Sequence, residues 1–470
     1  MSARVAVAST GTSPIARVGL GPQLAWASGS FATGALFNAM ALFALFFMTS
    51  ILGIAPAVAG TIILLARVYD GIIDPLIGAV SDRTRHRWGP RRIYLLIGAL
   101  GLGVSFVAFF NLSLLSIEGA EAGFIVTIIL LLYSTAYSIF SIPYLAMPPE
   151  FAPGYDDRTR LMSYRVFFQL AGVMAGAVGA PALIEMSGTE LGGYQFMGLI
   201  LGIAATALCI VVFIGAAWLP QLERPKKSGE VNALELLASP FTDMIKIIGN
   251  APFRQLTVIK LCQLAVLSTV LACTPYFFGF VLKLGQAEIG QFYGAFGVAG
   301  IVSVPIYRWI IGKAGKRESY LVLIILYALS LASWILWVPG ENGVFFYLRA
   351  VLIGSFSTGT LLCALAMLPD TMEYDRLQSG EAREGIMSGV WTFVENLAGA
   401  LGPFIIGLLL QANGLIQSRD PSVEQPQAVL TAVHWGASMI PALFCLVAVP
   451  LLFRYQLDEA TLERMRAKQP

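Results

Sequence analysis

Long apolar stretches recur through the whole sequence and decide what the chain can fold into. A helix rises 1.5 Å per residue, so about 20 apolar residues are needed to cross a hydrocarbon core roughly 30 Å thick. Strands of a membrane barrel need only about ten alternating residues, which these unbroken runs do not resemble. Twelve spans are predicted, at 22–50, 56–80, 93–115, 120–147, 162–185, 194–219, 254–283, 288–312, 319–338, 344–368, 385–411 and 428–453.

Only 12% of the residues are charged, whereas soluble domains carry roughly 25%, so an all-helical membrane protein is expected. Short cytoplasmic loops retain Lys and Arg, so the distribution of basic residues predicts orientation. The opposite set of loops holds only Lys283 and Arg419. We therefore predict an inner (plasma) membrane protein with both termini cytoplasmic, from the basic residues Arg83, Arg85, Arg87, Arg91, Arg92, Arg158, Arg160, Arg224, Lys226, Lys227, Lys246, Lys313, Lys316, Arg317, Arg376, Arg383, Arg464, Arg466 and Lys468.

The longest polar connection divides the spans six plus six. The predicted organisation is a cytoplasmic arm (1–19), a first six-helix bundle (20–220), a cytoplasmic linker (221–252), a second bundle (253–455) and a cytoplasmic tail (456–470). Within the linker, 231–248 is either an amphipathic helix at the membrane surface or a plain connection. Two such bundles are expected to rock about a central site in alternating access.

A glycine followed by a basic turn comes after the second span of each half. The first copy runs from Gly78 to Arg83 and on through Gly89 to Arg92, and the second runs from Gly312 to Arg317. These segments resemble the signature loop of the major facilitator superfamily. The resemblance implies a cytoplasmic gate formed by Asp82, Arg83, Arg91 and Arg92, and the alternative is a basic anchor beside a helix-ending turn.

The second span carries three ionisable residues. Arg67, Asp70 and Asp74 fall within roughly 60° of one helix face at 100° per residue. Two carboxylates one turn apart can coordinate sodium through oxygen, or share a proton tuned by the guanidinium. Pro75 also frees a backbone carbonyl one turn earlier. The alternative is an Arg67–Asp70 pair that only holds helices together.

The sequence around these charges resembles the glycoside–pentoside–hexuronide:cation symporters. The likeness is carried by Ala66 to Gly78 with Thr84 to Gly89, by Ser141 to Glu150, by Asp157 to Arg165, by Asn250 to Arg254, and by Pro369 to Tyr374 with Arg383 to Gly385. It implies that Asp70 and Asp74 bind the coupling cation, H⁺ or Na⁺, with Arg67 beside them and Ser138 as a further ligand. Ile73 stands where sodium-using members often have a polar residue, which favours a proton. No other cofactor is expected.

The cargo site departs from the family pattern. By the resemblance, Gly34 and Ser141 stand where sugar carriers have acidic residues, and Asn396, preceded by Glu395, stands where they have a lysine. Lys260 and Arg349 are unmatched bases in the sequence, and either could receive an anion or reach toward a helix end. The predicted substrate-binding residues are Tyr137, Ser141, Tyr144, Arg165, Lys260, Trp391, Glu395 and Asn396.

The predicted function is cation-coupled symport of a small organic solute, with a sugar or glycoside as one cargo. The alternatives are an amphiphile such as a lysophospholipid, an organic anion, or uncoupled facilitation. No nucleotide-binding loop, nucleophile elbow or metal-ligand spacing indicates an enzyme or an ATP-driven pump. The expected partners are the solute and the bilayer, without nucleic acid, for a protein expected to be a monomer.

Overall fold

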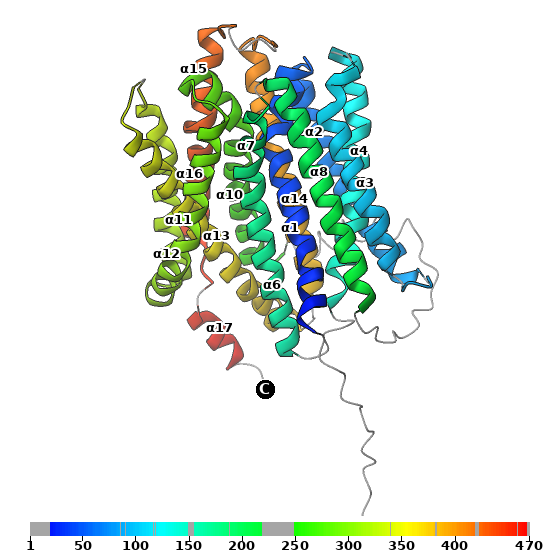
Figure 1. Cartoon of the computed structure of the whole chain (residues 1–470). Coiled ribbons are helices and arrows are strands. Elements are labelled where there is room, and N and C mark those ends of the chain that lie inside the picture. Colours follow the sequence, from blue (N-terminus) through cyan, green and yellow to red (C-terminus); the bar gives the residue numbers. More distant parts are fainter. Residues whose placement is uncertain are drawn as a thin grey trace, which may run out of the picture.

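The computed structural model describes residues 19–84, 86–89, 91–115, 117, 119–148, 155–187, 189–218, 249–338, 340–380, 383–418, 423–457 and 459–467. Within these ranges it contains helices and no strand, and 12 of the helices are long and apolar enough to cross a membrane. The predicted all-helical fold with twelve spans is confirmed (Figure 1). The arm at 1–18 and the linker helix predicted at 231–248 lie outside the described residues.

The elements of the first half include two spans that continue through a π-helical segment. They are α1 (Leu20–Phe46) with η1 (Phe47–Ile51), α2 (Pro56–Arg83), α3 (Arg92–Asn111), α4 (Gly119–Leu145), α6 (Tyr155–Met174) leading through η3 (Ala175–Gly179) to α7 (Ala180–Glu185), and α8 (Glu190–Gly215). The apolar composition predicted these spans, because a helix satisfies all of its own backbone groups in lipid.

The second half follows the same plan. Its elements are α10 (Ala251–Tyr276) with η5 (Phe277–Leu282), α11 (Gln286–Ala314), α12 (Lys316–Ala332), α13 (Gly343–Ser379), α14 (Glu384–Ala412), and α15 (Gln427–Ala437) followed by α16 (Met439–Arg454). The tail adds a short helix, α17 (Glu459–Arg466), which lies beneath the bundle in Figure 1.

The helix pairs that pack together in the first half recur in the second. In the first half α1 packs on α6 and α8, α3 packs on α4 and α8, and α2 packs on α4. In the second half α10 packs on α14 and α16, α12 packs on α13 and α16, and α11 packs on α13. The halves meet where α2 packs on α14, α7 on α11 and α1 on α10. The fold is therefore an internal repeat whose two copies face each other along a few helices.

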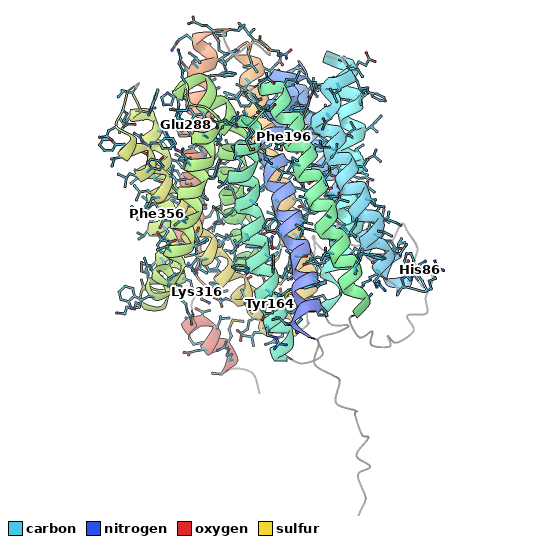
Figure 2. The ribbon with its side chains drawn as sticks, in the orientation of Figure 1. His86, Tyr164, Phe196, Glu288, Lys316 and Phe356 are labelled. Atoms are coloured by element: carbon cyan, nitrogen blue, oxygen red, sulfur yellow. The ribbon has the colours of Figure 1, made fainter. Side chains whose placement is uncertain are left out.

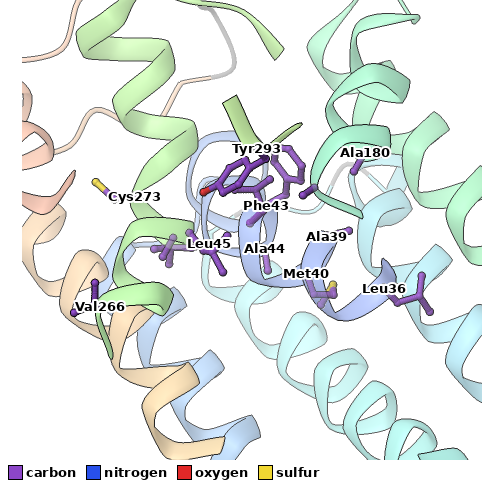
Figure 3. Packing of buried hydrophobic residues seen from close by; sticks show 14 of the residues in the cluster. Leu36, Ala39, Met40, Phe43, Ala44, Leu45, Ala180, Val266, Cys273 and Tyr293 are labelled. Atoms are coloured by element: carbon purple, nitrogen blue, oxygen red, sulfur yellow. The ribbon is translucent and has the colours of Figure 1, made fainter. Parts of the chain in front are cut away.

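The halves join tightly at one end of the bundle. We call the end where α1 begins and α17 lies the termini end, and the opposite end the far end; Figure 2 places Lys316 and His86 toward the first and Glu288 toward the second. At the far end the Thr49 and Tyr276 hydroxyl oxygens are 2.5 Å apart, which joins α1 to α10. Figure 3 shows Phe43 and Tyr293 among the buried residues of the hydrophobic core.

Glycines let α2 and α14 approach closely near the far end. A Cβ atom added to Gly60 would lie 2.8 Å from the carbonyl oxygen of Pro403, and one added to Gly407 would lie 2.3 Å from that of Pro56. Contacts this short leave room for hydrogen only. The halves are thus sealed together at the far end.

The end predicted for the tenth span is wrong. The tenth span was expected to end at residue 368, but α13 continues to Ser379, where Gly380 at φ 73° closes it. The added turns are polar and leave the apolar layer as helix, because partners outside the span hold them. The Lys316 ammonium lies 2.6 Å from Asp370, and Arg466 of α17 lies 2.7 Å from Glu373.

Candidate functional site

A charged cluster lies on one face of α2, midway along the helix. Residues three and four apart face the same side of a helix, so Arg67, Asp70 and Asp74 follow one another along it. The Arg67 guanidinium donates a hydrogen bond to Asp70 at 3.2 Å and sits 4.9 Å from the centre of the Phe37 ring. Asp70 is only 7% exposed. The Arg67–Asp70 pair, given above as the alternative, is therefore present, and the half-buried guanidinium compensates the buried carboxylate.

Asp74 has a different partner, on the neighbouring helix. The Ser138 hydroxyl of α4 donates to one Asp74 carboxylate oxygen at 2.5 Å. Pro75 lies inside α2 and has no N–H, so the Gly71 carbonyl has no helical donor four residues on. Carboxylate, hydroxyl and carbonyl oxygens are ligands that a hard cation accepts. In the described part of the chain, no group of three or more His, Cys, Asp or Glu residues could hold a metal ion.

A cavity of about 350 Å³ lies between the two halves, next to the α2 cluster. Its volume falls in the range of about 300–1,000 Å³ that small-molecule sites occupy. Most of its surface is apolar, with a few convergent polar groups. The first half lines it with Phe37, Met40, Ala41, Ala44, Ile63, Ala66, Arg67, Leu130, Tyr133 and Ser134, and the second half with Lys260, Leu264, Leu267, Ser268, Leu271, Leu361, Glu395, Asn396, Gly399 and Pro403.

The second half contributes an ion pair to the cavity wall. The Lys260 ammonium of α10 lies 3.5 Å from the Glu395 carboxylate of α14 and 5.4 Å from the centre of the Trp391 ring. The Trp391 indole N–H donates to Glu395 at 3.0 Å. Three predicted substrate residues therefore form one unit, and Asn396 lines the same wall.

The expectation that two bases lack partners is wrong. Lys260 is paired with Glu395, and Arg349 is paired with Glu341 and lies 4.9 Å from the Trp334 ring centre. The sequence did not indicate either partner, because neither lies on the same helix as its base. Glu395 lies on another helix, and Glu341 lies in the loop before α13.

Two substrate-binding residues predicted in the first half, Tyr144 and Ser141, are buried by packing. Tyr144 is 2% exposed, its hydroxyl lies 2.9 Å from that of Ser30, and its ring stacks on Trp26 at 4.6 Å. Ser141 is also buried. A Cβ atom at Gly34 would lie 2.9 Å from the Gln169 carbonyl oxygen, so no acidic side chain fits between α1 and α6 there.

Of the two further predicted residues, Tyr137 lies beside the cavity lining. The Tyr137 ring centre is 6.3 Å from that of Tyr133, which lines the cavity. Arg165 of α6 has a buried Nε atom without a hydrogen-bond partner in the described part of the chain. The structure thus brings Arg67, Lys260, Glu395 and Asn396 to the cavity, with Trp391 behind them.

Sequence reasoning missed Tyr133 and Ser134 as cavity residues. Each lies one helical turn before a residue that was selected, Tyr137 or Ser138, so the same helix face could have indicated them. The Tyr133 hydroxyl is buried and has no hydrogen-bond partner in the described part of the chain.

The basic loops bind helix ends in a repeated pattern. Arg91 donates to the Ala146 carbonyl at the end of α4, and Arg92 donates to the Phe213 carbonyl of α8 at 3.3 Å. In the second half Lys316 binds Asp370 of α13, and Arg317 donates to the carbonyl oxygens of α16 at Leu452 (3.0 Å) and Phe453 (2.8 Å).

The predicted cytoplasmic gate is only partly covered by these contacts. Arg83 is exposed at the end of α2, and the side chain of Asp82 lies outside what the structure describes. The contacts just given for Arg91 and Arg92 join helices of the first half to one another. A cytoplasmic gate in which these residues join the two halves remains a prediction.

The twelve membrane-spanning helices of the described residues repeat as two sets of six around a central cavity with paired charges in its wall, which defines a membrane transporter of the major facilitator type. Comparison with known proteins gives the family. The chain belongs to the MFS/sugar transport protein family, whose model matches residues 25–459. Its members are membrane transporters and not enzymes, and the chain is a multi-pass inner-membrane protein.

Relatives and solved structures agree with this assignment. The chain is 28% identical to the putative glycoside/cation symporter YagG of Escherichia coli K12, over 94% of this chain and 93% of the relative. It is 25% identical to the isoprimeverose transporter of Lactiplantibacillus pentosus, over 95% and 92%. A bacterial homologue of the human lysosomal transporter Spinster, solved inward-facing and unoccupied, shares the fold with a TM-score of 0.70 at 11% identity, over 95% and 97%.

Proposed function

We propose that this protein is a secondary active transporter that moves a small organic solute together with a cation. The observation that carries the proposal is the Asp74–Ser138 contact, beside an Arg67–Asp70 pair that is already complete. A carboxylate in the membrane interior is costly unless it is compensated. A neutral hydroxyl leaves the charge on Asp74, so a cation must supply the balance.

Coupling follows from that charge. While Asp74 is ionised, a rearrangement that shuts water away from it would bury an uncompensated charge at a cost of several kcal/mol. Binding of a cation at Asp74 and Ser138 removes this cost and allows the loaded carrier to rearrange. With the termini in the cytoplasm, as the basic loops predict, the end at which α2 and α14 meet closely is external.

Two ions fit the site in different ways. A proton needs only one carboxylate oxygen, and Ile73 and the nearby Arg67 favour it over a metal ion. Sodium would draw on Asp74, Ser138 and the Gly71 carbonyl as oxygen ligands. The proposal is therefore coupling to H⁺ or Na⁺, with Arg67, Asp70, Asp74 and Ser138 as the cation site.

The cargo proposal is a sugar or glycoside. Relatives are named as a glycoside/cation symporter, an isoprimeverose transporter and a putative sulfoquinovose importer, and the central cavity has the size of a small-molecule site. An amphiphile, an organic anion and uncoupled facilitation are the outcomes against which the proposal is tested.

The test measures cation binding on purified protein without any cargo. A ligand that binds only the native state raises the melting temperature by mass action. We would record thermal unfolding in sodium, in choline and across pH for the wild type, for Asp74→Asn, and for Glu373→Gln as a control carboxylate that is held by Arg466 outside the cavity. The response to sodium should change in Asp74→Asn alone, and the pH response of Asp74→Asn should differ from that of Glu373→Gln, which loses only the acid-range contribution of its pair with Arg466. Identical responses in all three proteins would mean an uncoupled carrier.

A further inference from the structure

The two members of the Lys260–Glu395 pair differ in the exposed fraction of their side chains. Both residues line the cavity, but the Lys260 side chain is only 1% exposed, whereas the Glu395 side chain is 39% exposed. Lys260 is covered by Glu395 and by the Trp391 ring. The group that a bound molecule meets on this wall is therefore the carboxylate and not the ammonium.

The carboxylate is held in place with one oxygen free. Its Oε1 atom accepts from Trp391 at 3.0 Å and lies 3.5 Å from Lys260, while Oε2 has no partner among the described residues. An ionised carboxylate only accepts hydrogen bonds. The neighbouring Asn396 also lines the cavity, and its side-chain amide has no hydrogen-bond partner in the described ranges and can donate. Acceptor and donor side by side match the two roles of a hydroxyl group.

The charges around the cavity cancel in pairs. Lys260 is balanced by Glu395, and Arg67 is balanced by Asp70. An anionic cargo would have to break one of these pairs or remain uncompensated, and leaving a buried charge without its partner costs several kcal/mol. The described lining thus favours an uncharged molecule.

The first half lacks the acidic acceptors that the family resemblance places at positions 34 and 141. The backbone of α6 occupies the space that a side chain at Gly34 would enter, and Ser141 is buried. What the first half offers instead is the hydroxyls of Tyr133 and Ser134 on α4. Charge-assisted hydrogen bonds are roughly twice as strong as neutral ones, so the strongest acceptor for cargo now lies on the second half.

We infer that Glu395, fixed by Trp391 and Lys260 and flanked by Asn396, is the residue that binds the cargo hydroxyls and selects an uncharged, hydroxyl-rich solute. This inference rests on the proposed transport function and names the cargo class of the same central cavity. Lys260 acts here as a positioning residue, since it orients the carboxylate without reaching the solute.

The test uses matched probes. Binding to the purified full-length protein is measured by calorimetry and thermal shift, with the neutral para-nitrophenyl glucoside, galactoside and xyloside and the acidic para-nitrophenyl glucuronide and galacturonide. Glucoside and glucuronide differ only in whether a hydroxymethyl or a carboxylate group is present. The wild type should bind at least one neutral probe at least tenfold more tightly than any acidic probe, and Glu395→Gln should weaken that binding at least tenfold. Glu373→Gln should leave it unchanged.

A charge exchange separates the binding role from a structural one. The double variant Lys260→Glu with Glu395→Lys keeps an ion pair between α10 and α14 but turns an ammonium toward the cavity. It should lose the neutral probe and gain the acidic one. A reversal would not follow if the pair only held the helices together.

Three results would overturn the inference: no neutral probe binds, an acidic probe binds the wild type as tightly as a neutral one, or Glu395→Gln binds within twofold of the wild type. Failure of the proposed function would look different. Glu395→Gln should retain the dependence of stability on sodium or pH that Asp74→Asn changes. Loss of the neutral probe with that dependence intact would concern only the cargo site.

Discussion

The seam between α2 and α14 makes a quantitative prediction about which conformation the protein prefers. A Cβ atom at Gly407 would lie 2.3 Å from the Pro56 carbonyl oxygen, and real Cβ atoms essentially never approach closer than 3.0 Å. In Gly407→Ala the two helices must therefore separate by at least about 0.7 Å, the difference between those distances. Overpacking of this kind costs about 1–3 kcal/mol.

That cost falls on the conformation sealed at the far end. Since every 1.4 kcal/mol is a factor of ten, the population should shift by about 5- to 150-fold toward a conformation in which this end is open. Uptake should slow, because each cycle must pass through the penalised state. Gly389→Ala on the same helix is the matched control, because a Cβ atom there would meet nothing within 4 Å.

Spin labels measure the shift directly. The exposed residues Thr61 on α2 and Gln411 on α14 can be changed to Cys and labelled, and the five native cysteines are buried and should not react. Distance distributions by double electron–electron resonance should gain a longer component in Gly407→Ala only. An unchanged distribution with wild-type uptake, or the same change in Gly389→Ala, would refute the role assigned to this seam.

Three other substitutions test different parts of the fold. Tyr276→Phe removes the hydrogen bond to Thr49, whose hydroxyl keeps its bond to the Leu45 carbonyl. The loss of about 1 kcal/mol should shift the population about fivefold toward the conformation with an open far end, measured with the same spin labels. No shift would show that this bond does not stabilise the closed far end. Asp74→Asn should abolish gradient-driven accumulation of a bound para-nitrophenyl glycoside in proteoliposomes while exchange across the membrane continues, whereas full accumulation would exclude Asp74 from coupling. Because the Lys316 side chain is 41% exposed, a double-mutant cycle of Lys316→Gln and Asp370→Asn should give a coupling of only about 0.2–1 kcal/mol in thermal unfolding, and a larger value would show that the pair is not screened.

The number of spans and the charged cluster of α2 could be predicted, because both depend on the local spacing of residues along the chain. Hydropathy sets the spans, and the spacing of Arg67, Asp70 and Asp74 places them on one face of a single helix. The Ser138 contact was expected from family resemblance alone. The pairing of Lys260 with Glu395 could not be predicted, because the two residues lie on helices far apart in sequence and no periodicity connects them.

The end of α13 shows a second limit of the sequence. Hydropathy marks where the apolar layer stops, and the tenth span was therefore expected to stop with it. A helix continues into water when its side chains find partners, and those of Asp370 and Glu373 come from the first turn of α12 and from α17 in the tail. Such partners are known only once the fold is known.

The distribution of ion pairs between the halves explains how the two halves can move relative to each other without breaking an ion pair. Arg67 and Asp70 belong to one helix, and Lys260 and Glu395 both belong to the second half, so neither pair has to separate when the halves move. Asp74 differs, because its described partner is the neutral hydroxyl of Ser138. On the proposed function, the coupling cation cancels this charge, and coupling would then depend on the carboxylate of Asp74.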